Sequence, residues 1–412
     1  MNSIISVFDF RRDALLKIVA WLLVFSSITG GILLSQPFYF FAVGLLGVLI
    51  FAKGGVRFSN VGVLLLLIAC VISLIVNHPP SFFKAWNRLG VYTLVLVVVS
   101  PLFYSDYAVS LRLKVLLYFL YIGVILSVGS FFAYFLGINL FERQGEMLEI
   151  GAGTFSGLMN HSMALGPISA LSAILLFAFI VIPNGKAKKP SRKAVLISLF
   201  VFCCGACLLA ASRIALVGLV LGVLVVLFVS SRDNLAKAFR MIILVLFIAG
   251  VTYPVWGRFT AFVIQKQEGN TAQGSIFYSR EDKFTARIYE FRSSPIVGIG
   301  YCVADPDFTG VNVTNGRVEP GSSWLAIASM TGILGLLAFL PLCLAALIKV
   351  WKIRDTLVCG ILAGMLLFFF VHMIAEGYIY APKSCFSLLF WLIISSIYGI
   401  TIFEEKGNLF KI

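Results

Sequence analysis

Charged residues are scarce in this chain: Lys, Arg, Asp and Glu account for 12% of its 412 residues, whereas hydrophobic residues account for 60%. A typical soluble domain has about 25% charged and about 45–50% apolar residues. A compact soluble fold of this size could not hide so much apolar surface. A disordered chain is excluded too, because disorder requires few apolar and aromatic side chains. The composition therefore predicts an all-α polytopic membrane protein.

Metal ligands and disulfide partners are also few. The chain has only three His residues. Cys203, Cys204 and Cys207 lie together within one apolar run, where a thiol behaves as a small apolar group. Cys302 is the only cysteine of the longest polar stretch, so it has no partner nearby in the sequence. We therefore expect no metal site, no cofactor and no disulfide scaffold.

Long apolar runs alternate with short polar stretches along almost the whole chain. A helix needs about 20 mainly apolar residues to cross ~30 Å of hydrocarbon. Two of the runs are nearly continuous and are divided at Ser212-Arg213, because one unbroken helix would exceed the bilayer thickness. The sequence thus predicts twelve transmembrane helices, at 15–34, 37–51, 61–76, 89–103, 112–138, 160–182, 193–211, 213–231, 238–255, 322–348, 356–375 and 385–403.

Basic residues are distributed unevenly between the two sides of these helices. With the N-terminus in the cytoplasm, 20 of the 32 Lys and Arg residues lie inside and 12 outside, seven of the latter in segment 256–321. The 18 acidic residues divide into 7 inside and 11 outside, so the net charges are 20 − 7 = +13 and 12 − 11 = +1. The positive-inside rule therefore predicts that both termini are cytoplasmic. Basic residues scattered between apolar runs form no stripe for nucleic acid.

The division of the chain follows from the one long polar segment. Residues 1–255 are predicted to hold transmembrane helices one to nine, and residues 322–412 hold helices ten to twelve and a cytoplasmic tail. Between them, residues 256–321 form a large external loop. Within it, the segment 283–295 predicts a short amphipathic helix that stops at Pro295.

Arginines at the outer edge of the membrane are candidates for function, because charges near hydrocarbon are costly. Arg213 opens a predicted span, and Arg287 and Arg292 lie on the predicted external helix. Arg forms bidentate hydrogen bonds to phosphate and stays charged at working pH. We expect these three residues to bind a diphosphate. The alternatives are a snorkelling interfacial side chain for Arg213 and a surface ion pair with Glu290, three residues away on the same face, for Arg287.

Two carboxylates near the same edge are candidates for a catalytic base. Glu319 stands just before the tenth span, where Ser322 or Ser323 is expected to cap the helix, and Glu376 is flanked by apolar residues. Either could take the proton of an attacking hydroxyl. A simple helix N-terminal charge is the alternative for Glu319. His161 is a further candidate, although a lone His at a membrane edge is more often a packing residue.

At these residues the chain resembles the O-antigen polymerase/ligase superfamily of bacterial envelope glycan assembly. The resemblance covers roughly residues 150–400. It implies a GT-C-like membrane glycosyltransferase that transfers glycan from undecaprenyl diphosphate with inversion and without a metal, in the inner membrane and facing the periplasm. The matching motifs are Ala-Ser-Arg213, Arg287-(x)7-Pro295-(x)2-Gly298-(x)-Gly300, Thr-Gly332-Ile-Leu-Gly335, whose glycines should allow close helix contact, and Gly153-Thr-Phe-Ser-Gly157-Leu-Met-Asn-His-Ser.

Members of the ligase branch carry a His before the turn that resembles Gly332-Ile-Leu-Gly335, whereas this chain has Glu319-Pro-Gly-Ser-Ser-Trp324 there. This difference favours a polymerase that joins lipid-linked repeat units, with a chain-length regulator as a candidate partner. The first alternative is a ligase that transfers glycan to lipid A–core. The second is a transporter of lipid-linked sugars, although paired repeats and broken helices, which are typical of transporters, are not evident.

Overall fold

The computed structural model describes residues 10–28, 34–140, 155–182, 190–232, 278–305, 316 and 318–407, with scattered positions between 234 and 275. Within this part, the chain is helical apart from one antiparallel ribbon of two short strands, β1 (Arg57–Phe58) and β2 (Phe103–Tyr104). The all-α polytopic fold expected from the composition is confirmed.

Helices occupy eleven of the twelve predicted spans, and most of the twelfth, 238–255, lies outside the described residues. Eight helices in the described part are long and apolar enough to cross a membrane, while α2 and α3 are shorter apolar helices. The helices are α1 (Phe10–Ile28), α2 (Gln36–Phe51), α3 (Val61–Asn77), α4 (Ala85–Val99), α5 (Asp106–Phe135), α6 (Ser162–Val181), α7 (Pro190–Leu209), α8 (Arg213–Ser230), α10 (Tyr278–Ser293), α11 (Ser323–Val350), α12 (Thr356–Ala375) and α13 (Cys385–Glu405).

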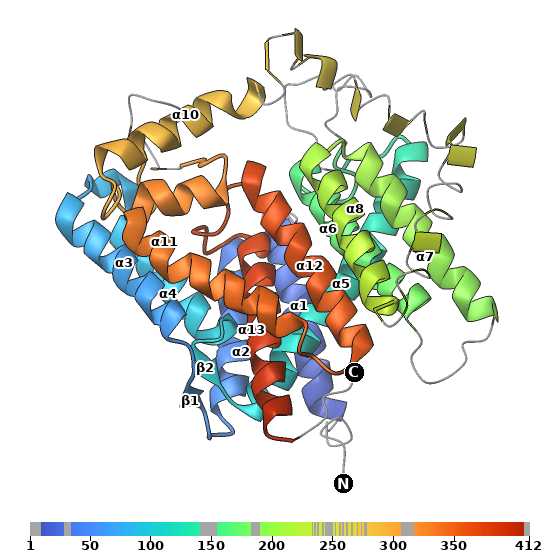
Figure 1. The fold of residues 1–412 in the computed structure, drawn as a ribbon, viewed down its shortest axis with the longest axis horizontal. Helices are drawn as coiled ribbons and strands as arrows, with labels where there is room; N and C mark the ends of the chain where they lie inside the picture. Colours follow the sequence, from blue (N-terminus) through green and yellow to red (C-terminus); the bar gives the residue numbers. More distant parts are fainter. Residues whose placement is uncertain are drawn as a thin grey trace.

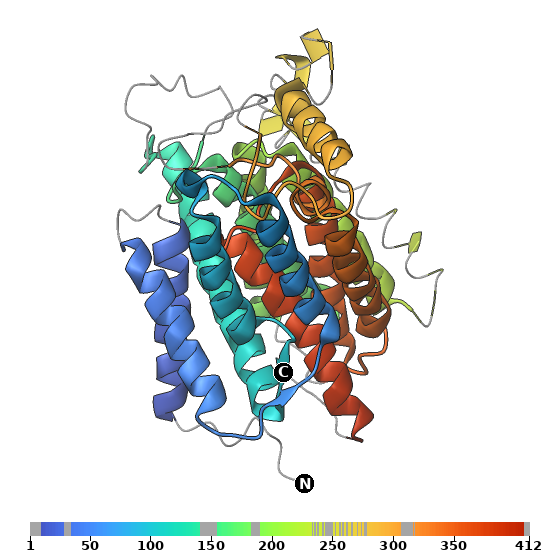
Figure 2. The same cartoon turned by 90° about the vertical axis from the view of Figure 1, so that its left-hand side faces the viewer.

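The long helices run side by side, and α10 lies across one end of the bundle (Figures 1 and 2). The helix pairs α12 and α8, α6 and α7, and α11 and α3 pack closely. The backbones of α8 and α12 lie so close that a Cβ added at Gly222 would lie 3.0 Å from the carbonyl oxygen of Gly364. Small residues at such crossings allow close packing between membrane helices.

The opposite end of the bundle, which we call the ribbon end, carries the β1–β2 ribbon. Here Lys406 Nζ lies 3.1 Å from Asp106 Oδ1, and Lys114 Nζ lies 2.9 Å from Asp13 Oδ1. The start of α1 and the finish of α13 are therefore both at the ribbon end. Just inside it, buried Arg112 donates to the carbonyls of α4 and β2 and to α13, and thereby ties these elements together.

Candidate active site

The segment after α10 joins α11 through backbone hydrogen bonds. Gly332 interrupts α11 with φ 64° and ψ −159°. Backbone groups that this interruption leaves without helical partners form hydrogen bonds with the segment after α10. Ile333 N donates to Pro295 O over 2.8 Å, and Met330 O accepts from Gly300 N over 3.2 Å. The close contact expected at Gly332 is thus made with a loop and not with another helix, because the positive φ opens the helical hydrogen-bond ladder. The two glycine motifs form one junction.

This junction is also bonded to α3. Ser73 Oγ donates to Met330 O over 2.7 Å, and Asn77 Nδ2 donates to Gly298 O over 2.8 Å. The amphipathic helix predicted before Pro295 is confirmed as α10, which begins at Tyr278, five residues earlier than expected, and ends at Ser293. Its position over the bundle is therefore set by membrane helices.

We expect Gly332→Ala to destabilise the protein. A Cβ at Gly332 would lie 2.3 Å from Ile296 O, and this region of φ/ψ is sparsely populated by residues other than glycine, at a cost of about 1–3 kcal/mol. Thermal unfolding of the detergent-solubilised protein should show a melting temperature lowered by several degrees. Gly44→Ala is the matched control, because no atom lies within 4 Å of a Cβ there. Equal melting temperatures for both variants would contradict the role of this junction.

Arg287 and Glu290 form an ion pair on α10, with Nη2 and Oε1 2.5 Å apart. The expected shared face is confirmed, but the pair is not on the surface, because the two side chains are 2% and 1% exposed. Burial raises the pKa of Glu290 and lowers the pKa of Arg287. Glu290 also accepts from Asp305 N over 2.9 Å. Among the described residues, Nε and Nη1 of Arg287 have no hydrogen-bond partner.

The two predicted carboxylates meet at Arg280. Its Nη2 lies 2.6 Å from Glu376 Oε1, and its Nη1 lies 3.3 Å from Glu319 Oε1, although the sequence separates Arg280 and Glu376 by 96 residues. Lys283 Nζ also lies 2.5 Å from Glu319. Arg280 belongs to the outer set of ionisable residues, but no role was predicted for it from the sequence. Its spacing to Lys283 and Arg287, three and seven residues, is the signal of one helical face that could have identified it.

Arg213 stands at the N-terminus of α8, where the chain turns sharply after α7 through a positive φ of 48° at Ala211. The separation of these two helices near Ser212 is confirmed. Arg213 donates a hydrogen bond to Gln267, and its charge interacts with that of Arg280. Two guanidinium groups within electrostatic range of each other, one of them at the N-terminus of α8, favour an anion between them.

The segment that carries Glu376 is held against the start of α11. Ser323 Oγ donates to Glu376 O over 2.7 Å and accepts from Tyr378 N over 3.0 Å. Ser322 caps α11 by accepting from Leu325 N, as the sequence predicted. Glu319, just before α11, and Glu376, just after α12, therefore reach Arg280 from two segments that are hydrogen-bonded to each other.

Two further residues were predicted for the site, Arg292 and His161. Arg292 is exposed on α10. The ring of His161 caps α6, because its Nδ1 accepts from Met163 N over 2.9 Å. This contact is a structural role for His161.

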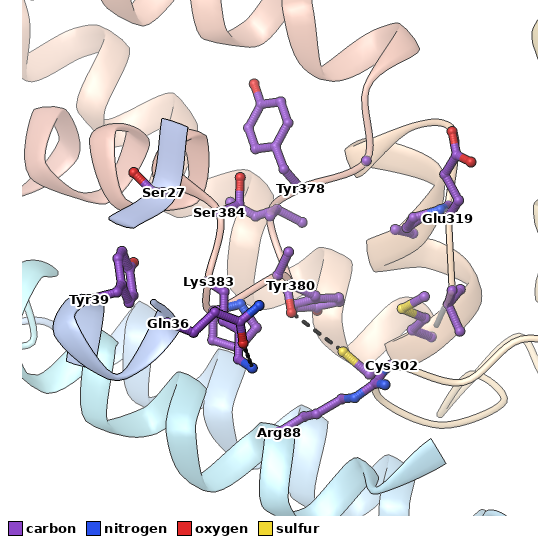
Figure 3. Close-up of a pocket in the computed structure, with 18 of the residues that line it drawn as sticks. Ser27, Gln36, Tyr39, Arg88, Cys302, Glu319, Tyr378, Tyr380, Lys383 and Ser384 are labelled. Carbon is purple, nitrogen blue, oxygen red and sulfur yellow. Dashed lines mark hydrogen bonds between the residues drawn. The ribbon is translucent and has the colours of Figure 1, made fainter. Parts of the chain in front are cut away.

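A cavity of about 810 Å³ adjoins Glu319 (Figure 3). Its charged lining residues are Arg88 from α4, Lys383 from the segment between α12 and α13, and Glu319. Arg88 interacts with the thiol of Cys302, and burial raises the pKa of this thiol to about 11, so the thiol is neutral at pH 7. Arg88, which precedes the fourth predicted span, and Lys383, which lies between the last two spans, were missed because neither belongs to a recognisable motif.

A comparison with known families matches residues 197–340 to the family described as O-antigen ligase. No curated protein matches the chain. The matched range includes Arg213, Arg280, Arg287 and Glu319, whereas Glu376 and Arg88 lie outside it. The resemblance predicted from the sequence is confirmed over these residues, and together with the many apolar helices it points to a multi-pass bacterial membrane protein. Over residues 197–340, this chain is thus similar to the O-antigen polymerase/ligase superfamily.

Proposed function

We propose that this protein is a polysaccharide repeat-unit polymerase that uses a glycan linked to undecaprenyl diphosphate. One observation carries the proposal: Arg280 joins Glu319 and Glu376 beside a cavity and within electrostatic range of Arg213. Cations are thereby brought together with candidate bases. In this proposal the α10 end faces the periplasm and both termini are cytoplasmic.

The arginines bind the diphosphate of the donor. Arg213 and Arg280, with the N-terminus of α8, neutralise the charge that develops on the leaving group, which is the largest single contribution in many enzymes. Arg287, two helical turns from Arg280 on the same face of α10, adds a third positive charge from its buried pair with Glu290. Arg292 adds positive charge on the exposed side of α10.

Glu319 is the base in the transfer step. Its side chain is 58% exposed, whereas that of Glu376 is 17% exposed, so Glu319 is the more accessible to an incoming hydroxyl. The acceptor hydroxyl gives its proton to Glu319, and its oxygen forms a bond to the anomeric carbon of the donor glycan. The bond from that carbon to the diphosphate oxygen breaks, and undecaprenyl diphosphate leaves with the electron pair. Glu376 holds Arg280 in place.

The nature of the acceptor separates a polymerase from a ligase. The stretch before α11 has Glu319 where the ligase branch has His, and this favours a polymerase acting on lipid-linked repeat units, together with a chain-length regulator. Ligation to lipid A–core is the second candidate, favoured by the description of the matched family.

Glycan analysis of a deletion strain tests these functions. A polymerase deletion should accumulate single repeat units on the lipid carrier at the outer leaflet, and the wild-type gene should restore polymer. Long polymer on the carrier with none on lipid A would indicate a ligase instead. Single units retained at the inner leaflet would indicate a transporter. A normal glycan profile would contradict all three.

A further inference from the structure

The cavity beside Glu319 has a cationic wall that the proposed reaction does not use. Arg88 and Lys383 line it, and Lys383 Nζ donates to the neutral amide oxygen of Gln36 over 2.6 Å. Glu319 is the only carboxylate among the described lining residues, and Arg280 and Lys283 already pair with it. The described part of this wall therefore favours an anionic ligand.

The same cavity contains a buried hydroxyl without a partner. Tyr39 is 2% exposed, and its hydroxyl has no hydrogen-bond partner among the described residues. A buried polar group left unpaired is unfavourable, so a ligand hydroxyl or carboxylate that approached Tyr39 would gain a hydrogen bond. Figure 3 shows Tyr39 and Glu319 on opposite sides of the cavity, so a ligand that contacts both must extend across it.

The size and lining suit a short oligosaccharide. Small-molecule sites typically have volumes of about 300–1,000 Å³ and combine apolar walls with a few placed polar groups. Asn160, Gln36 and Ser384 offer polar atoms, while Tyr380 and Ile379 offer apolar surface. The described lining of this cavity does not include Arg213, Arg280 or Glu376. Of the residues proposed to act in the transfer, only Glu319 belongs to both the diphosphate site and the described lining of the cavity.

We infer that this cavity is the acceptor subsite and that Arg88 and Lys383 select an acceptor glycan bearing an acidic group, either a carboxylate or a phosphate. This inference rests on the proposed function, because it requires a transfer at Glu319. The acidic sugar sits against the cationic wall, and the reacting hydroxyl faces Glu319.

Binding of a glycan that cannot act as donor tests the inference. The probe is the repeat-unit glycan released by mild acid from the lipid carrier of the deletion strain. It is compared with the same glycan after reduction of its carboxylates or hydrolysis of its phosphates. Full-length protein in nanodiscs should bind the acidic form at least tenfold more tightly than the neutralised form. The double variant R88Q/K383Q should bind both forms equally.

Two matched variants separate recognition from folding. Lys84→Gln removes an exposed cation four residues from Arg88 that is outside the described lining, and it should keep the wild-type preference. Arg88→Lys keeps the charge and should retain most of the preference. A wild-type protein without preference, an unchanged preference in R88Q/K383Q, or a repeat unit with no acidic group would each overturn the inference.

A second probe, inorganic diphosphate, tests whether the cationic wall binds an acidic sugar or the diphosphate of the acceptor lipid. If R88Q/K383Q loses affinity for it while Arg213→Gln does not, the wall binds the diphosphate of the acceptor lipid, and the assignment to an acidic sugar is overturned. Failure here is distinct from failure of the proposed function. A deletion strain that accumulates single units supports the polymerase even if R88Q/K383Q binds like the wild type.

Discussion

Arg280→Gln should reduce polymer formation by at least about 100-fold. Arg280 contacts both Glu319 and Glu376 and adds its charge to that of Arg213. Removing one group that stabilises charge in a transition state typically costs about 10²- to 10³-fold in rate. The initial rate of polymer formation in membranes, at equal protein level by immunoblot, measures this effect.

Arg280→Lys tests whether the planar group matters as well as its charge. A single ammonium cannot reproduce the fork of a guanidinium, so we expect an intermediate loss of about tenfold. Lys84→Gln is the control, because it removes an exposed cation at the same end of the bundle and should leave the rate within twofold of wild type. Wild-type polymer levels in Arg280→Gln would refute the proposed diphosphate site.

Glu319→Gln should lower kcat by about 10²- to 10⁴-fold, the usual contribution of general base catalysis, while KM changes little. The amide can still accept a hydrogen bond but cannot take the acceptor proton. Steady-state kinetics with the lipid-linked repeat unit measures both parameters.

Glu376→Gln is the matched variant, because it makes the same chemical change on the other partner of Arg280. We expect it to raise KM more than it lowers kcat, since Arg280 would lose its closer partner, at 2.6 Å, and hold the donor less well. A larger loss of kcat in Glu376→Gln than in Glu319→Gln would show that Glu376 is the base. Unchanged kcat in both would refute a carboxylate base at this site.

Features that depend on local periodicity were predicted from the sequence. Hydropathy located eleven helices, because a bilayer demands about 20 apolar residues in a row. The pairing of Arg287 with Glu290 followed from their spacing of three residues, and the Ser322 cap from its place before an apolar run. Burial was not predictable from spacing: the ion pair with Glu290, considered as a surface alternative for Arg287, is present but buried.

Only the tertiary structure decided which of these features share a site. Arg280 meets Glu376 across 96 residues, and the cavity combines residues of α2 and α4 with the segment after α12. Sequence periodicity specifies which face of a helix is apolar. It does not specify which distant helix covers that face, because membrane helices pack through close backbone contacts that many pairs of small residues could make. The sequence by itself determined a polytopic helical membrane protein with cations and carboxylates at one edge. The packing of α10 against α11, and the contact of Arg280 with Glu376 just after α12, determined which of them meet.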